Sequence, residues 1–266
     1  MRYKIHLILS IACMLIITSC SKDDFLDFLI GPQPKFIDNN QFVPGFNILG
    51  VIRPDSIGNQ TMSMVHVERV LPAIGSASDS FDVADARVMI YRIEDNQVKD
   101  STQFDYVNND NSYATYQPLV FRPKAGEHYK IKCTDSSLPT LTAETIVPDI
   151  PAIVDDNVTV SGNTITLSIL HNTSASMYDV YLYTGGKVIP NRIMQPESGD
   201  TQIEIKNTGT ITPDAKLVIY AYDKNLTEYL TASNVFIKPN TYRPPFTNVT
   251  NGYGCFGSLN LLVRKL

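Results

Sequence analysis

Apolar and polar residues alternate in short runs from residue 46 onward, which is the period-two pattern of strands with one buried face. Turn-forming residues separate the runs at positions 94–96, 108–112, 124–126 and 135–137. Short strands at this spacing are typical of a β-sandwich. In the first half of the chain, the positions predicted to face a core are Val65, Val67, Ala86, Val88, Ile90, Tyr129, Ile131 and Cys133.

A second series of strands follows residues 147–151, where Pro148 and Pro151 hold the chain extended and cannot continue a central ladder. We therefore predict an all-β fold with two tandem β-sandwich domains, over residues 41–148 and 149–266. The inward positions predicted for the second sandwich are Ile165, Leu167, Ile169, Tyr178, Val180, Leu182, Ile203, Ile205, Leu217, Ile219 and Ala221.

One short helix is predicted over residues 223–233. Leu226 and Leu230 are four residues apart, as on one face of a helix, and Asp223 is positioned to cap its first turn. A bent loop is the alternative for this segment.

The closing stretch of the chain combines glycines with large apolar residues. Gly252, Gly254 and Gly257 permit backbone angles that other residues resist. We expect a tight turn that seats Phe256 in the core, followed by a last strand through Leu259, Leu261 and Val263. A ligand-binding glycine loop is disfavoured, because no phosphate-binding pattern surrounds these glycines.

The first residues of the chain predict export. Arg2 and Lys4 precede an apolar run at 5–17 that ends in small residues before Cys20, which is the pattern of a cleaved secretory signal. The run is too short for a membrane-spanning helix. The pattern resembles a bacterial lipoprotein lipobox, which implies a signal peptide at 1–19, acylation of Cys20 and a lipidated tether at 20–40. Several acyl chains make such anchoring lasting.

The charge of the expected mature chain disfavours nucleic acid as a partner. Removal of residues 1–19 takes away two basic residues and no acidic ones, which leaves 20 basic and 27 acidic residues and a net charge of about −7. Nucleic-acid binding needs a basic footprint. After Cys20 no apolar run approaches the roughly 20 residues that cross a bilayer.

Candidate chemistry is sparse, and we predict a non-enzyme with no cofactor and no metal. Strand parity directs His66 and His128 to solvent and leaves His171 partly buried. No zinc-protease helix, Cys-x-x-Cys pair or Gly-x-Ser-x-Gly elbow occurs. The oxygen-rich stretches 105–111 and 155–157 lack the glycine and closing glutamate of a calcium loop, so we interpret both as solvated turns.

Cys133 and Cys255 are the two cysteines that remain after Cys13 leaves with the signal and Cys20 is acylated. Cys133 shares the inward parity of Tyr129 and Ile131, which favours a small buried residue over a disulfide.

The order of features resembles the Bacteroidetes lipoproteins of domain of unknown function family 4249 over nearly the whole chain. The resemblance is carried by the lipobox, the stretches 83–90 and 123–131, the proline linker and the closing stretch 244–257. It implies an immunoglobulin-like module similar to the regulatory domain of carboxypeptidases, followed by a fibronectin-like module. Cys255 stands where the family leads us to expect an aliphatic residue. The residues after the lipobox resemble the signal that sends such lipoproteins to the outer face of the outer membrane; they are Ser21, Lys22, Asp23 and Asp24.

Three functions are open at this point. The resemblance implies a non-catalytic surface module that binds a partner, as an accessory to a TonB-dependent outer-membrane nutrient transporter. Glycan binding is the second, with Tyr181, Tyr183, Tyr220 and Tyr222 as candidate stacking rings, although the lack of tryptophan counts against it. A structural or adhesin-like subunit is the third, and it predicts exposed edge strands able to accept a neighbour. The ligand, the partner and the oligomeric state are not specified by the sequence.

Overall fold

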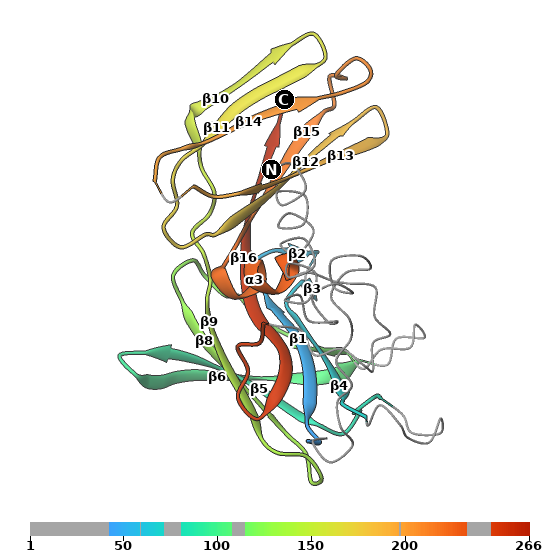
Figure 1. The fold of residues 1–266 in the computed structure, drawn as a ribbon, viewed down its shortest axis with the longest axis vertical. Coiled ribbons are helices and arrows are strands. Elements are labelled where there is room, and N and C mark those ends of the chain that lie inside the picture. The colour runs from blue at the N-terminus through green and yellow to red at the C-terminus, as the bar shows by residue number, and fades with distance from the viewer. Residues whose placement is uncertain (1–42, 59, 72–80, 108–114, 197, 233–245) are drawn as a thin grey trace, which may run out of the picture. The chain divides into compact units, whose positions relative to one another are not determined.

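The computed structural model describes residues 43–58, 60–71, 81–107, 115–196, 198–232 and 246–266 (Figure 1). The fold is all-β with one short described helix, and it contains two β-sandwiches, as predicted.

The N-terminal sandwich contains two sheets that share one strand. The long strand β6 pairs with β5 up to Phe104 and with β7 from Asp105 onward, so it passes from one sheet into the other. The strand order is β1-β4-β7-β6-β5-β8-β9, and β2 and β3 form a separate short ribbon. The strands are β1 (Phe46–Ile52), β2 (Ser56–Ile57), β3 (Gln60–Thr61), β4 (Met64–Arg69), β5 (Arg87–Glu94), β6 (Gln97–Val107), β7 (Thr115–Gln117), β8 (His128–Thr134) and β9 (Leu141–Ile146).

In these strands, buried and exposed residues alternate as predicted. Every position predicted to face the first core is buried, from Val65 on β4 to Cys133 on β8. The predicted turn at 94–96 joins β5 to β6, with Asp95 and Asn96 at φ of 51° and 58°. Two residues in the left-handed region are what a two-residue hairpin turn needs, and Asp and Asn tolerate it better than most residues.

The C-terminal sandwich follows residues 147–152, which form no strand. One of its sheets has the order β10-β11-β14, and the other has the order β13-β12-β15-β16. All the predicted inward positions of this half are buried in a second core between these sheets. The strands are β10 (Ile153–Ser161), β11 (Thr164–Ile169), β12 (Met177–Thr184), β13 (Lys187–Met194), β14 (Thr201–Lys206), β15 (Lys216–Tyr222) and β16 (Gly252–Lys265).

The predicted helix is confirmed as α3 (Lys224–Thr231). Asp223 is its N-cap, because its carboxylate accepts a hydrogen bond of 2.8 Å from the backbone N–H of Leu226. Leu226 is buried, whereas Leu230 packs partly buried against the same cluster.

Strand β16 differs from the prediction, since the closing glycines lie within a strand and form no tight turn. Its first half, up to Ser258, pairs in parallel with β1, and its second half pairs antiparallel with β15. A Cβ atom at Gly254 would lie 1.9 Å from the carbonyl oxygen of Ile48, and the φ of Gly254 is +94°. Glycine is therefore required by the close approach of the β1 backbone. The first half of β16 thus joins the N-terminal sandwich, although it lies within the predicted segment 149–266.

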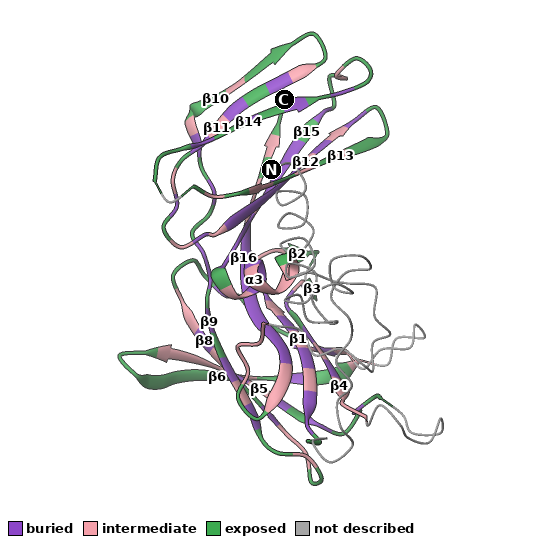
Figure 2. Ribbon diagram, viewed as in Figure 1, coloured by how far each residue is buried: buried purple, intermediate pink, exposed green. Residues whose placement is uncertain are grey.

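The two faces of β16 contribute to three clusters. Phe256 fills the first core over Gly50, where a Cβ atom would lie 2.7 Å from its ring, and Leu262 packs against the second core. On the opposite face, Cys255 and Leu259 form a third cluster with Leu226 of α3. Figure 2 shows the middle of β16 as buried. Val263, predicted to be part of the closing strand, lies in it but is 54% exposed.

A buried polar network lies where β16 passes the end of β9. Thr145 donates a hydrogen bond of 2.5 Å to the Asp223 carboxylate, and Thr145 and Ser258 share another of 3.0 Å. Ser258 donates to the carbonyl of Ile146, and Asn260 donates to the carbonyl of Pro148. Burial raises the pKa of Asp223, and the hydrogen bonds from its neighbours only partly oppose this shift.

We expect Gly254→Ala to lower the free energy of unfolding by about 3 kcal/mol or more, because it combines backbone strain with overpacking against Ile48. Gly209→Ala is the matched control, since a Cβ atom there meets nothing within 4 Å and the change should stay within about 1 kcal/mol. Urea denaturation measures both variants. Equal effects of the two substitutions would contradict the close approach.

The raised pKa of Asp223 predicts a stability difference that depends on pH. Because the folded-state pKa lies above the unfolded value of about 3.9, the contribution of Asp223 is most favourable below that pH and is lost as the pH rises through the folded-state pKa. Asp223→Asn keeps a capping side chain that does not titrate. In urea denaturation, wild-type stability should therefore fall relative to Asp223→Asn as the pH rises above about 4. A difference independent of pH would refute this account.

Candidate recognition face

The outward face of the β13-β12-β15-β16 sheet carries aromatic and apolar side chains. Val180 and Leu182 of β12 are buried in the second core, so the alternate residues of this strand face outward. Register places Tyr181 between Pro190 and Val218, and Tyr183 between Val188 and Lys216. We call this surface the tyrosine face and define it by Asp179, Tyr181, Tyr183, Val188, Arg192, Val218, Tyr220, Leu261 and Val263.

The rings on this face are held in defined contacts. Tyr181 and Tyr220 pack edge to face, with ring centroids 5.7 Å apart at 84°. The guanidinium of Arg53 lies 5.7 Å from the centroid of Tyr220, and the ammonium of Lys216 lies 4.8 Å from that of Tyr183. Both distances are within the range of cation–π attraction. The face is therefore built from fixed rings, two of which are covered by a cation.

Tyr222 is an exception among the four tyrosines predicted as candidate stacking rings. Tyr181, Tyr183 and Tyr220 are half-buried, but Tyr222 is buried and packs in the third cluster with Leu226 of α3. The prediction failed there because α3 follows Tyr222 directly and folds back over the sheet.

A charge pair stands at one end of the tyrosine face. The carboxylate of Asp179, on a residue only 3% exposed, accepts two hydrogen bonds of 2.7 Å from Arg192 and one of 3.0 Å from the Tyr222 hydroxyl. The hydrogen bond with Asp179 raises the pKa of Arg192, and burial raises the pKa of Tyr222. The paired carboxylate holds Arg192 in place, while about half of the Arg192 side chain stays exposed.

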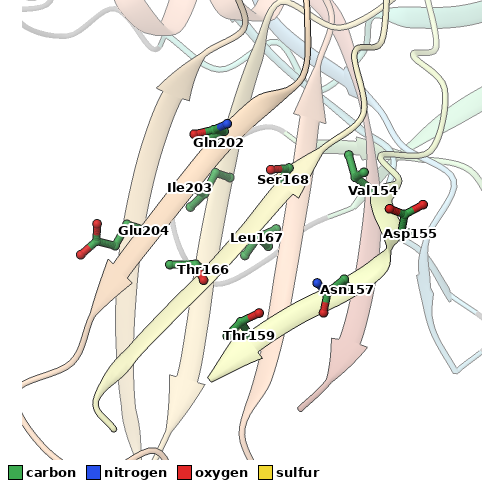
Figure 3. A pocket seen from close by; sticks show the side chains of 10 residues that line it. All are labelled: Val154, Asp155, Asn157, Thr159, Thr166, Leu167, Ser168, Gln202, Ile203 and Glu204. Carbon is green, nitrogen blue, oxygen red and sulfur yellow. The ribbon is translucent and has the colours of Figure 1, made fainter. Parts of the chain in front are cut away.

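The outward face of the other sheet is polar. Hydroxyl, amide and carboxylate side chains from β10, β11 and β14 line a shallow groove of about 390 Å³ there (Figure 3). Its β10 wall contains a bulge, where Asp155 and Asp156 both have φ of 53°. The groove is lined by Val154, Asp155, Asn157, Thr159, Thr166, Leu167, Ser168, Gln202, Ile203 and Glu204.

The predicted histidines lie apart in the fold. His66 and His128 are half-buried, and their Nε2 atoms lie 3.1 and 3.0 Å from carboxylate oxygens of Glu68 and Glu144. His171 is partly buried, as predicted, and its backbone N–H donates to Asp200. Within the described ranges, no group of three or more His, Cys, Asp or Glu residues could hold a metal ion.

The predicted buried thiols are confirmed. Cys133 and Cys255 are both buried and free, so they form no disulfide. Burial raises the pKa of Cys133 to about 12 and raises that of Cys255 as well. Because both pKa values are raised, little thiolate forms at neutral pH, and both cysteines suit a packing role.

The predicted lipid site lies outside the described residues. This holds for Cys20, for the export signal Ser21, Lys22, Asp23 and Asp24, and for the signal peptide and tether at 1–40. Part of the predicted solvated turn, at 108–111, also falls outside. In the described part of the chain, no helix is long and apolar enough to cross a membrane.

Comparisons with family models and with curated proteins give no match. Among solved structures, a pullulanase from Anoxybacillus sp. LM18-11, complexed with maltotriose, matches with 10% identity and a TM-score of 0.21, over 67% of this chain and 24% of the pullulanase. The chicken interferon gamma receptor alpha chain matches with 11% identity and a TM-score of 0.20, over 67% of this chain and 87% of that one. The chain spans about a quarter of the pullulanase. Similarities this weak support no inference about fold or function. The fold assignment rests on the strand order.

The Asp179–Arg192 pair was not predicted from the sequence, although one feature of the sequence indicated it. Asp179 interrupts an otherwise apolar and aromatic run from Met177 to Tyr183 at an outward position. A carboxylate in such a run needs a partner. The identity of that partner depends on the β12–β13 register, which follows from the two-glycine turn at Gly185 and Gly186.

We expect Arg192→Met to destabilise the protein by about 1–2 kcal/mol, because it leaves the buried Asp179 carboxylate without its cation. The double variant Asp179→Asn/Arg192→Met removes both charges and should be more stable than Arg192→Met alone. Denaturant titration of the two single variants and the double variant gives the coupling energy. A coupling energy near zero would mean that the pair contributes nothing to stability.

Proposed function

We propose that this protein is a non-catalytic, lipid-anchored surface module that binds a protein partner through the tyrosine face. The main support for the proposal is the difference in polarity between the two outward faces of the C-terminal sandwich. One is polar, with Thr166 and Glu204 at its centre, whereas the other presents Tyr181, Tyr183 and Val263. An apolar patch rimmed by polar residues is a mark of an interaction site.

The make-up of the tyrosine face suits protein recognition. Tyrosine and arginine are enriched at the centre of protein interfaces, because they combine a large contact area with a polar group. Tyr181 and Tyr220 fix each other, and Asp179 fixes Arg192, so little side-chain freedom is left to lose on binding.

Glycan stacking suits this face less well. A sugar ring needs the open face of an aromatic ring, whereas Arg53 lies over Tyr220, Lys216 lies over Tyr183, and Tyr222 is buried. Of the four candidate rings, Tyr181 is the one with neither a cation over it nor a buried position.

A polymerising subunit is also disfavoured by the edge strands of this sandwich. Pro190 lies within the edge strand β13, where it has no N–H to donate, and a bulge at Asp155 and Asp156 distorts β10. The third edge, β14, carries an ion pair of 2.9 Å between Glu204 and Lys206. Proline, bulges and charges are devices that protect sheet edges from pairing with another chain.

The proposed location follows from the N-terminal sequence. Acylated Cys20 would hold the protein in the outer membrane, and Ser21, Lys22, Asp23 and Asp24 would direct it to the outer face. The resemblance to the lipoproteins of family 4249 supports the choice of partner, an outer-membrane nutrient transporter of the TonB-dependent kind.

The test is capture of the transporter by the acylated chain extracted from outer membranes, after intact-mass analysis has verified the lipid on Cys20. We expect recovery of one outer-membrane transporter in stoichiometric amount. Tyr181→Ser/Tyr183→Ser should lower the recovery at least tenfold, because it removes two central contacts.

Tyr91→Ser is the matched control, since Tyr91 is half-buried on an outward face of the other sandwich. Its recovery should equal that of the wild type. Equal recovery with all variants would exclude the tyrosine face, and failure to recover any transporter would exclude the proposed partner.

A further inference from the structure

The chain contains a single Asn-Gly sequence, Asn251-Gly252, and it lies at the start of β16. Asn251 is exposed, and its backbone is left-handed, with a φ of 58°. Asparagine adopts this conformation more readily than most residues, because its short polar side chain can hydrogen-bond locally. Asn251 therefore forms a solvent-exposed bend that leads into the strand.

Packing requires glycine at position 252. A Cβ atom there would lie 2.4 Å from the Leu141 side chain and 2.9 Å from the carbonyl oxygen of Phe46. Any larger residue would therefore push β16 away from its neighbours. Asparagine is a thermally labile residue, and glycine after it leaves the backbone nitrogen unhindered by a side chain. The fold thus keeps a labile pair of residues at the start of β16.

The side-chain amide of Asn251 is held less firmly than that of the nearby Asn248. The Asn248 amide donates to the carbonyls of Phe256 and Glu144, at 2.7 and 3.2 Å. Its oxygen also accepts a hydrogen bond of 2.9 Å from the backbone N–H of Phe256. The Asn251 amide donates a hydrogen bond of 3.3 Å to the carbonyl of Thr140. Because this bond is long and exposed, it restrains the Asn251 side chain only weakly.

We propose that Asn251 is a site of spontaneous deamidation in the folded protein. The backbone nitrogen of Gly252 loses its proton to a base in solution and bonds to the side-chain carbonyl carbon of Asn251. The amide nitrogen of Asn251 takes up a proton and leaves as ammonia, which closes a succinimide ring. One water molecule then opens the ring, and nothing is oxidised or reduced. The reaction does not depend on the proposed protein partner.

The two products of ring opening differ in their effect on β16. Attack of water at the side-chain carbonyl gives aspartate, which tolerates the left-handed bend as asparagine does. Attack at the backbone carbonyl gives isoaspartate, in which the main chain runs through the former side chain and is one carbon longer. Thr250 is held to Thr142 by hydrogen bonds of 2.8 and 3.2 Å, and Gly252 is in register with Phe46. A longer link cannot preserve both pairings, so isoaspartate should loosen the start of β16.

The test is incubation of the folded chain at mildly alkaline pH, followed by proteolysis and fragment mass spectrometry. We expect a mass increase of one dalton at Asn251, and its rate should rise with pH because the Gly252 nitrogen must lose its proton. Asn248 is the internal control, since Val249 follows it and its amide is firmly held; it should react at least tenfold more slowly. Asn251→Gln is the matched variant, and it should gain no mass because its ring would be one atom larger.

A parallel incubation in urea measures the reaction of the unfolded chain. A mass increase at Asn251 in urea but none in the folded chain would overturn the proposal, and so would equal rates at Asn248 and Asn251. An isoaspartyl methyltransferase labels the isoaspartate product, and the labelled chains should unfold at a lower urea concentration than Asn251→Asp. Equal unfolding of the two would refute the effect on β16. Circular dichroism verifies that each variant retains the fold.

Discussion

The close approach of two backbones at Gly254 is the contact on which the rest of the structure depends. A side chain at this position would overlap the carbonyl of Ile48, so glycine alone lets β16 lie against β1. From this contact the strand continues past the end of β9 and pairs with β15. Each sandwich is thereby completed by a different half of the same strand, and the hydrogen-bonded ladder runs without a break from one to the other.

Alternation along β16 then distributes its side chains among separate environments. Phe256 and Leu262 face the two main cores, and between them Ser258 and Asn260 hydrogen-bond to the carbonyls of Ile146 and Pro148. These polar residues satisfy carbonyl groups of the connecting segment that would otherwise be buried without partners. A wholly apolar strand would leave these carbonyls unpaired, which explains why two polar residues interrupt the apolar sequence.

Local patterns predicted the parts of this fold that local physics determines. The inward positions from Val65 to Ala221 and the cap at Asp223 follow from strand period and from capping chemistry, which act over a few residues. The parallel pairing of β16 with β1 joins residues about 200 positions apart, and no local period encodes such a partner. The burial of Tyr222 and the pairing of Asp179 with Arg192 likewise depend on neighbours brought in by tertiary structure.

The position of β16 after every other described strand has a consequence for biosynthesis. Neither sandwich has all its described strands until the 14 residues of β16 (Gly252–Lys265) are available. A ribosome-bound or partly translocated chain that lacks β16 therefore exposes an unpaired edge on β1 and another on β15. Completion of both sandwiches therefore waits for β16, and a product terminated before it leaves two incomplete sheets for proteases to recognise.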